Sequence, residues 1–227
     1  MPRRGNTTVA HCVSGGKALL ICVKPRRGGT ITRRHQDIFL FSLIEGNSPE
    51  MNQGLIKNVQ IRHVVKSDLD ACFTIESTCY TTDAATREKI EKRIAIFPAG
   101  FLVAEANGQV VGMVNSGATD KDDITDDAFK DMTDHIHDGK HIVIFSLAVL
   151  PAFQGVGISR MLMEKFIGAS RDLEKEKILL MCKTGLISYY RKYGFHYAGK
   201  SKSTLGGFEW HEMYLPHITE KELIQNY

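Results

Sequence analysis

Apolar runs typical of strands alternate along the chain with segments of helical periodicity. Residues 141–150 are almost continuously apolar and β-branched, which is typical of a strand covered on both faces, and residues 178–183 have the same character. Shorter strands are predicted at 59–65, 195–198 and 208–215. Since these strands are separated by helical segments, the pattern predicts an α/β domain built on one mixed sheet with helices on both faces.

The N-terminal half of this domain has clear start and turn signals. Ser67 is a plausible N-cap for a helix, and Asp83 is a plausible cap for a second one. The first helix carries one stripe made of Leu69, Cys72, Phe73, Glu76 and Tyr80, and the second has a charged, solvated face made of Arg87, Glu88, Lys89, Glu91, Lys92 and Arg93. Residues 100–106 and 109–118, joined by Asn107-Gly108, predict a β-hairpin.

A glycine-rich turn follows the long apolar strand. Gly155 and Gly157 precede a helix whose apolar residues are Ile158, Met161, Leu162, Phe166 and Ala169. Such a turn lets a ligand approach the backbone, and the free amides and dipole of the helix favour a phosphate. A Rossmann fingerprint would need glycine at Arg160, and a P-loop would need Gly-Lys-Ser/Thr, so neither fits. An ordinary strand-to-helix turn stays the alternative.

Composition limits the classes of protein that this chain can represent. With 227 residues and 43% hydrophobic content, one sizeable core is expected. No apolar run approaches the length of a membrane span, which predicts a soluble protein without a membrane partner. The five cysteines, at 12, 22, 72, 79 and 182, form no C-x-x-C pair and indicate reduced thiols in a cytoplasmic protein.

Charge is distributed unevenly between the N-terminus and the rest. The net charge is +3, but the first 50 residues hold eight basic and three acidic residues, which leaves 21 basic and 23 acidic residues beyond them. The globular part therefore gives no reason to expect nucleic-acid binding. Residues 1–36 lack acidic residues, which is compatible with an organellar transit peptide, a disordered arm, or translation that starts at Met51. We expect residues 1–55 to be poorly ordered and 56–227 to form a single domain.

Two segments carry a resemblance to a known family. The stretch Q-G-V-G-I-S at 154–159 resembles the acetyl-CoA pyrophosphate loop of the GNAT acetyltransferases, Q/R-x-x-G-x-G/A, although Ser159 stands where the family prefers glycine or alanine. Residues 186–195 resemble the family segment a-x-x-F-Y-x-x-x-G-F. L-M-C at 180–182 and Y-Y-R-K-Y-G-F-H-Y-A-G at 189–199 resemble the arylalkylamine (serotonin) N-acetyltransferase branch, and the match spans about 59–215.

This resemblance implies a GNAT fold: a mixed, mostly antiparallel, twisted sheet of about seven strands, splayed between strands four and five. It implies acetyl-CoA as co-substrate, with the pantetheine arm along the backbone of Leu147, Ala148 and Val149. The pyrophosphate would lie on the loop of Gln154, Gly155, Val156, Gly157, Ile158 and Ser159. Tyr190 matches the tyrosine that protonates the departing thiolate, since a phenol keeps its proton at neutral pH. The alternative is that Tyr190 is only the inward residue of a short helix.

The general base is less clearly indicated. Histidines that the branch carries on strand four map to Val143 and Phe145, so both are missing, and His141 could substitute unless it is a wet residue at a strand end. Glu76 is the better candidate, because a carboxylate on an apolar stripe is costly unless it is paired or functional. It is equally compatible with a structural carboxylate that bonds a neighbouring backbone group. No metal is expected, because the chemistry needs none and H-x-H-x-x-x-H from His135 is a weak pattern.

The function predicted from the sequence is acetyl transfer from acetyl-CoA to a small primary amine such as an arylalkylamine, in a monomer or homodimer. Protein N-terminal or lysine acetylation is the alternative enzyme, and a non-catalytic acyl-CoA-binding module is the alternative of another class. Met113, Phe145, Tyr80 and residues 203–208 are expected to supply an apolar pocket. A peptide acceptor needs an open groove, whereas a small amine needs a closed funnel. The position of the loop at 119–140 therefore distinguishes these two kinds of acceptor, and a helical turn is predicted in it near 126–132.

Overall fold

The computed structural model describes residues 58–80, 82–122, 124 and 127–217. The predictions for residues 1–55, Cys12 and Cys22 among them, lie outside this part of the chain. Its seven strands are β1 (Gln60–His63), β2 (Phe101–Ala106), β3 (Gln109–Thr119), β4 (His141–Val149), β5 (Lys177–Cys182), β6 (His196–Lys200) and β7 (His211–Pro216). Its α-helices are α2 (Leu69–Cys79), α3 (Arg87–Ile96), α4 (Ile158–Asp172) and α5 (Ile187–Arg191), and none of these is long and apolar enough to cross a membrane.

All seven strands form one sheet in the order β1-β2-β3-β4-β5-β7-β6. Neighbouring strands are antiparallel except β4 and β5, which confirms the predicted mixed, mostly antiparallel sheet. The predicted hairpin is present between β2 and β3, where Asn107 and Gly108 both have positive φ, 52° and 76°. This is the geometry that a two-residue type I′ turn requires, and it explains the Asn-Gly pair.

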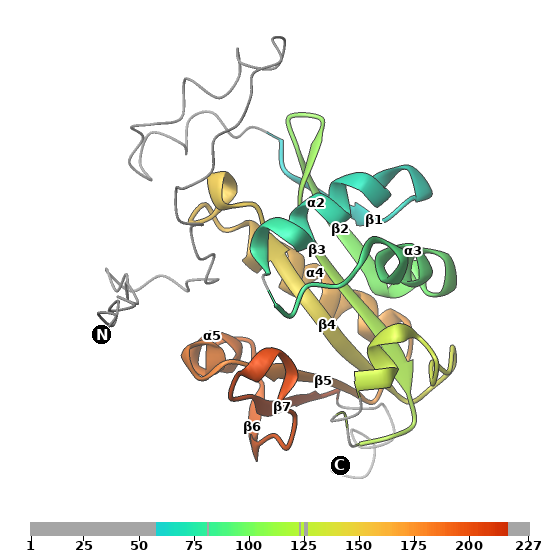
Figure 1. Ribbon diagram of the computed structural model, residues 1–227, viewed down its shortest axis with the longest axis vertical. Coiled ribbons are helices and arrows are strands. Elements are labelled where there is room, and N and C mark those ends of the chain that lie inside the picture. Colours follow the sequence, from blue (N-terminus) through green and yellow to red (C-terminus); the bar gives the residue numbers. More distant parts are fainter. Residues whose placement is uncertain (1–57, 81, 123, 125–126, 218–227) are drawn as a thin grey trace, which may run out of the picture.

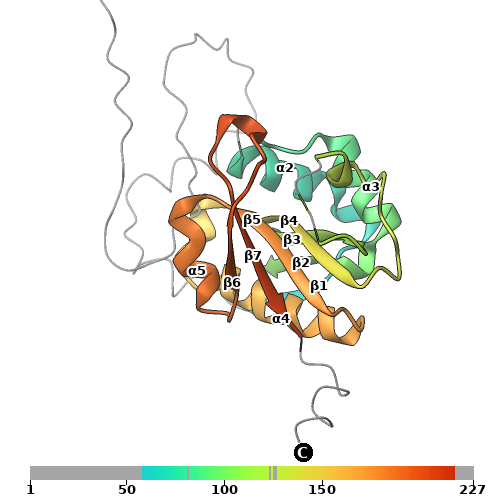
Figure 2. The same cartoon turned by 90° about the horizontal axis from the view of Figure 1, so that it is seen from below.

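Helices cover both faces of the sheet, as predicted. Figure 2 shows α2 and α3 on one side of the strands and α4 on the other. The main core lies between α4 and the sheet and contains Leu162 and Phe166 of α4, with Leu102 and Ile142 from the strands. A second core lies under α2 and α3 and contains Ile75 and Ile90. In Figure 1, β5, β6 and β7 diverge from β4 as a separate group with α5 beside it.

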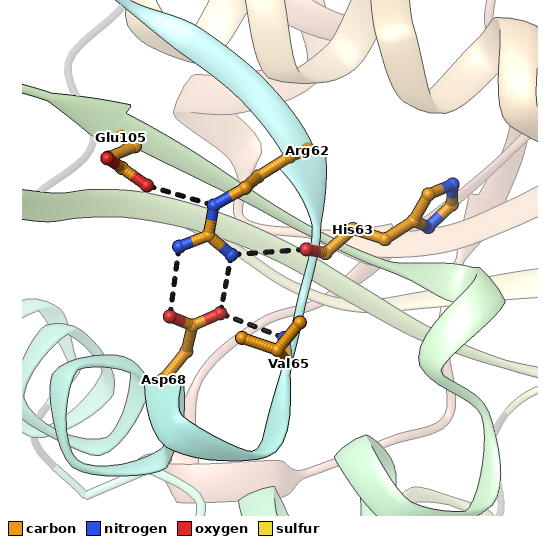
Figure 3. Close-up of polar contacts among 5 residues, drawn as sticks. All are labelled: Arg62, His63, Val65, Asp68 and Glu105. Carbon is orange, nitrogen blue, oxygen red and sulfur yellow. Dashed lines mark hydrogen bonds and ion pairs between the residues drawn. The ribbon is translucent and has the colours of Figure 1, made fainter. Parts of the chain in front are cut away.

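The start of α2 differs from the sequence prediction. Ser67 is exposed and caps nothing; it lies in a 3-10 turn, Lys66–Asp68, and Asp68 is the residue before the helix. The Asp68 carboxylate accepts the backbone N–H of Val65 at 2.9 Å and binds both terminal nitrogens of Arg62, at 2.7 and 3.0 Å. Arg62 also reaches Glu105 of β2 at 2.9 Å (Figure 3). A bidentate ion pair, not a serine cap, therefore ties β1 to the helix start.

Three further local predictions were wrong. The buried side of α2 contains Ile75 and Cys79, whereas Phe73 is only half-buried, because the stripe that packs inward runs through Leu69, Cys72, Ile75, Glu76 and Cys79. Thr86, not Asp83, caps α3, with its side chain accepting the N–H of Lys89. Arg93, assigned to the solvated face of that helix, is 4% exposed and points into the protein. A charged residue on an otherwise solvated helix face can be buried when acceptors inside the protein form hydrogen bonds with it.

Candidate functional site

The central feature of the site is the separation of β4 from β5. The two parallel strands pair only from His141 with Lys177 to Ile144 with Leu180, although both strands continue. The β3–β4 register shifts between Asn115 and Ser116, opposite Phe145. This bulge bends β4. Beyond the bulge, the edge of β4 that would pair with β5 in a continuous sheet does not pair with it. An edge of this kind can bind an extended ligand through main-chain hydrogen bonds.

Side chains bond two carbonyls of this β4 segment. The Tyr80 hydroxyl donates to the Leu147 carbonyl oxygen at 3.0 Å, and the Gln154 side-chain amide donates to the Val149 oxygen at 2.7 Å. The bond from Gln154 ties the glycine turn back to the strand. Ala148 lies in the core under α2 and is fully buried. Tyr80 and Gln154 thus hold β4 in place at the predicted pantetheine position.

The glycine turn has the geometry of an anion cradle. Gly155 and Gly157 have φ of 81° and 92°, in the left-handed region that favours glycine, and Gly157 is the N-cap of α4. A Cβ placed on either glycine would meet no atom within 4 Å, so the space beside the backbone is open. Ile158 anchors the first turn in the core, while Ser159 faces the hydroxyl of Tyr189 on α5. The first-turn amides of a 15-residue helix are available to a phosphate here.

A cavity of about 290 Å³ lies on the α2 side of the separated strands. The cavity is lined by Glu76 of α2, Tyr80 directly after that helix, Leu147 of β4, Cys182 of β5 and Tyr190 of α5. The loop before α3 and the segment between β6 and β7 supply Asp83, Leu205 and Trp210. The cavity therefore brings together both predicted catalytic residues and the predicted cofactor strand, which are distant in sequence.

Glu76 is a buried carboxylate whose two oxygens differ in their partners. Its side chain lines the cavity, and the residue is only 3% exposed. Oε1 accepts the backbone N–H of Ala85 at 3.0 Å, whereas Oε2 has no partner of hydrogen-bond geometry among the described residues. Burial raises the pKa of this carboxyl, and the Ala85 amide, the charge of Arg93 and the nearby Ser146 hydroxyl oppose the rise. One oxygen therefore bonds a backbone group, as the structural interpretation expects, and the role of Glu76 as a base stays a prediction.

Tyr190 points from α5 into the same cavity. It is 7% exposed and packs edge-on against Tyr189 and Phe195, with ring centroids 5.2 and 5.6 Å away. Its hydroxyl makes no hydrogen bond to any described residue. Burial, and then the neighbouring Cys182 thiol, raise the pKa of this phenol above its ordinary value. The group therefore stays protonated at neutral pH, as an acid for a departing thiolate must.

A chain of buried polar groups supports the site from behind. Arg93 Nη1 donates to Asn115 Oδ1 at 3.0 Å, and Asn115 Nδ2 donates to Ser146 Oγ at 2.6 Å, next to Glu76. Arg93 also donates to the Lys130 carbonyl at 3.0 and 3.3 Å. Burial lowers the pKa of this guanidinium, and the negative charge of Glu76 raises it. This series of hydrogen bonds connects α3, β3, β4 and the loop before β4, and it places the positive charge of Arg93 near the Glu76 carboxylate.

Sequence reasoning missed most of these supporting residues. Asn115 and Ser146 were detectable as polar residues inside otherwise apolar strands, but Arg93, Asp83, Lys183 and Trp210 carried no such signal. Predicted pocket residues Tyr80, Phe145 and Leu205 line the cavity.

Two residues considered for the site lie elsewhere. Met113 is fully buried in the core under α2. His141, expected to be either wet or a substitute base, is 4% exposed at the far end of β4, with Nε2 3.3 Å from Asp122, and it does not line the cavity. His141 pairs with Thr119 of β3 and with Lys177 of β5, so this end of β4 lies inside the sheet.

Comparisons with known proteins agree with this architecture. The probable hydrolase YhcX of Bacillus subtilis (strain 168) is 26% identical over 147 residues, which cover 60% of this chain but only 28% of that protein. The loading GNATL domain of CurA from Lyngbya majuscula superposes with a TM-score of 0.63 at 16% identity, covering 70% of this chain and 98% of that one. Ard1 from Thermoplasma volcanium superposes with a TM-score of 0.56 at 20% identity, covering 71% and 99%.

A comparison of the sequence with models of protein families identifies the family of this chain. The model of the acetyltransferase (GNAT) family matches residues 69–195, which include α2, the separated strands β4 and β5, the glycine turn and α5. By this match over more than half of its length, the chain belongs to the acetyltransferase (GNAT) family.

Proposed function

We propose that this protein transfers the acetyl group of acetyl-CoA to a primary amine of a small molecule. The observation that carries the proposal is the convergence of Glu76 and Tyr190 on one cavity beside the uncovered part of β4. The open space at Gly155 and Gly157 supports the assignment of the pyrophosphate to the N-terminus of α4. Among structural neighbours of the same fold, yncA from Salmonella typhimurium was solved with acetyl-CoA.

The thioester of bound acetyl-CoA supplies an activated acetyl group, and the residues of the cavity supply proton transfer. Glu76 Oε2 accepts a proton from the acceptor ammonium, directly or through water, so that the neutral amine can attack. The new N–C bond forms as the C–S bond breaks, and Tyr190 gives its proton to the leaving sulfur. The attacking nitrogen then loses its second proton, which restores the tyrosine phenol directly or through water. Holding both substrates in one cavity supplies much of the acceleration, because it replaces an encounter of two molecules.

The closure of the cavity favours a small acceptor over a protein chain. The loop after α2 meets the turn between β6 and β7, where a Cβ on Gly206 would lie 3.2 Å from the Thr82 hydroxyl. On the other side, Ile124 and Phe129 of the 119–140 loop are buried against Val143, and a 3-10 turn (Asp127–Asp131) is held there by Arg93. These contacts support a funnel, as a small amine requires, and the resemblance to the arylalkylamine branch makes arylalkylamines acceptors to be tested.

A thiol-release assay tests the proposal. Acetyl-CoA should be consumed with tryptamine, phenethylamine or an aliphatic amine, and not with short peptides. Tyr190→Phe should lower kcat by about 10²- to 10⁴-fold with acetyl-CoA affinity unchanged. Tyr197→Phe is a matched control, because Tyr197 is 42% exposed and its hydroxyl bonds His211 outside the cavity.

Each other outcome selects a different function. Turnover only with peptides would make the protein an N-terminal or lysine acetyltransferase. Binding of acetyl-CoA without turnover on any acceptor would make it an acyl-CoA-binding module. A normal rate in Tyr190→Phe would remove this tyrosine from the acid role.

A further inference from the structure

A second buried carboxylate faces the cavity from the loop between α2 and α3. The side chain of Asp83 is 4% exposed, and its Oδ2 lies 3.3 Å from the ammonium of Lys183, which follows β5. Oδ1 has no hydrogen-bond partner among the described residues. A buried carboxylate oxygen is expected to have a donor, so this position calls for one that the protein itself does not provide.

Aromatic rings complete the surroundings of the Lys183 ammonium. Its Nζ lies 3.6 Å from the ring centroid of Phe208 and 5.5 Å from that of Trp210. The two rings meet edge to face with centroids 6.4 Å apart, and the Trp210 indole N–H donates to the Leu205 carbonyl. A carboxylate beside two aromatic faces is a recognition site for ammonium groups. The cage formed by Asp83, Phe208 and Trp210 thus holds a cation, and the cation present is the protein's own.

The unmet polar groups of the cavity show which chemistry a ligand must bring. Among the described residues, two buried side-chain oxygens that line the cavity lack hydrogen-bond partners, Glu76 Oε2 and Asp83 Oδ1, and both are acceptors. The other basic side chains of the wall already have partners: Lys89 pairs with Asp131 at 2.6 Å, Lys130 Nζ lies 5.8 Å from the Trp210 ring centroid, and Arg93 is bonded as described above. A ligand with donors at two separate places satisfies this cavity, whereas a carboxylate near Asp83 would be repelled.

We infer that the acceptor carries a second ammonium group, which takes the place of Lys183 in the cage while the reacting amine lies at Glu76. This inference rests on the proposed function and names its substrate class, short diamines. Lys183 is an internal competitor that moves outward when the acceptor enters, because its side chain is already 28% exposed. The exchange of one ammonium for another leaves the charge beside Asp83 unchanged. A volume of about 290 Å³ is large enough for a chain of about six heavy atoms.

Calorimetric titration of the CoA-loaded protein tests the inference without turnover. In the wild type, 1,4-diaminobutane should bind at least about tenfold more tightly than 1-aminobutane, which lacks the second ammonium. Lys183→Ala, which removes the internal competitor, should tighten diamine binding about tenfold and leave 1-aminobutane unchanged. Asp83→Asn should bind the two amines equally.

Lys200→Ala is the matched control, because Lys200 is an exposed lysine that pairs with Glu209. It should behave like the wild type. Equal binding of the two amines by both wild type and Lys183→Ala overturns the inference, as does weaker diamine binding by Lys183→Ala. Failure of the proposed function is distinguishable from failure of this inference. If the protein binds diamines selectively but releases no thiol, the ammonium cage stands and the transferase activity fails. If thiol release is equally fast with both amines and insensitive to Asp83→Asn, the transferase activity stands and the diamine inference fails.

Discussion

Replacement of Glu76 by glutamine separates the catalytic role proposed for this carboxylate from its structural role. Glutamine has the same shape, and its amide oxygen can still accept the Ala85 N–H that lies 3.0 Å from Glu76 Oε1. The substitution therefore preserves the link between α2 and the start of α3 but removes the proton acceptor in the cavity. We expect kcat/KM to fall about 10²- to 10⁴-fold, the usual contribution of a positioned base.

The raised pKa of Glu76 determines how the stability of this variant compares with that of the wild type as the pH changes. Burial raises the pKa of Glu76 in the folded protein, so the folded state holds this proton more tightly than the unfolded state does. The free energy of unfolding therefore falls as the pH rises above the ordinary carboxyl range, by about 1.4 kcal/mol for each unit by which the folded pKa is raised. Glutamine cannot ionise and escapes this loss.

One opposing contribution partly offsets this gain. The hydrogen bond from Ala85 to a neutral amide is weaker than that to a carboxylate, by about 1 kcal/mol. We therefore expect the stability of Glu76→Gln at pH 8 to lie within about 1 kcal/mol of the wild type, or above it. At pH 5 the wild type should gain relative to the variant, because more of its carboxyl is protonated in the folded state.

Two measurements check this reasoning. The pH profile of kcat/KM should rise with pH in the wild type and lose this rise in Glu76→Gln, and urea unfolding at pH 5 and pH 8 gives the stabilities. Glu91→Gln is the control, because Glu91 is an exposed glutamate on α3. A variant that keeps the rising profile places the base elsewhere. A variant that loses more than about 2 kcal/mol at pH 8 shows that the carboxylate is mainly structural.

Three further predictions concern the cradle, the buried arginine and the helix start. Gly157→Ala, at φ 92°, should weaken acetyl-CoA binding about tenfold or more and destabilise the fold by about 1–2 kcal/mol; Gly168→Ala, within the same helix and with open space at its Cβ, should stabilise it by about 0.5–1 kcal/mol in thermal unfolding. Arg93→Met should move the rise of the pH profile to higher pH, because the Arg93 charge lowers the pKa of Glu76; an unmoved profile would show that this charge does not reach the base. Arg62→Met should cost about 1–3 kcal/mol at pH 7 by urea unfolding. Hydrogen bonds from Arg62 and Val65 hold the pKa of Asp68 below its usual range against the effect of burial, so the stability that they contribute is present at neutral pH and is lost as the pH falls through the acid range; equal losses on acidification in wild type and Arg62→Met would contradict this.

The sequence alone was enough for the features that depend on local chain chemistry. The Asn107-Gly108 turn, the glycine turn before α4 and the apolar strands β4 and β5 follow from conformational preference and periodicity, which act over a few residues. The family resemblance added the roles predicted for Tyr190 and the glycine turn. Glu76 was found because a carboxylate on an apolar helix face is costly and therefore informative.

What only the tertiary structure decided is which side chains from distant segments meet in the cavity. Arg93 belongs to a helix with a charged surface pattern, and its burial depends on acceptors that β3 and the loop before β4 bring within reach. Asp83 and Lys183 are 100 positions apart in the sequence, and their ion pair exists because β5 separates from β4 and ends opposite the loop after α2. The sequence by itself determined the glycine turn proposed to hold the cofactor, since a backbone turn is local. The cavity proposed for the acceptor is a property of packing, since its charges are set by partners that no short stretch of sequence contains.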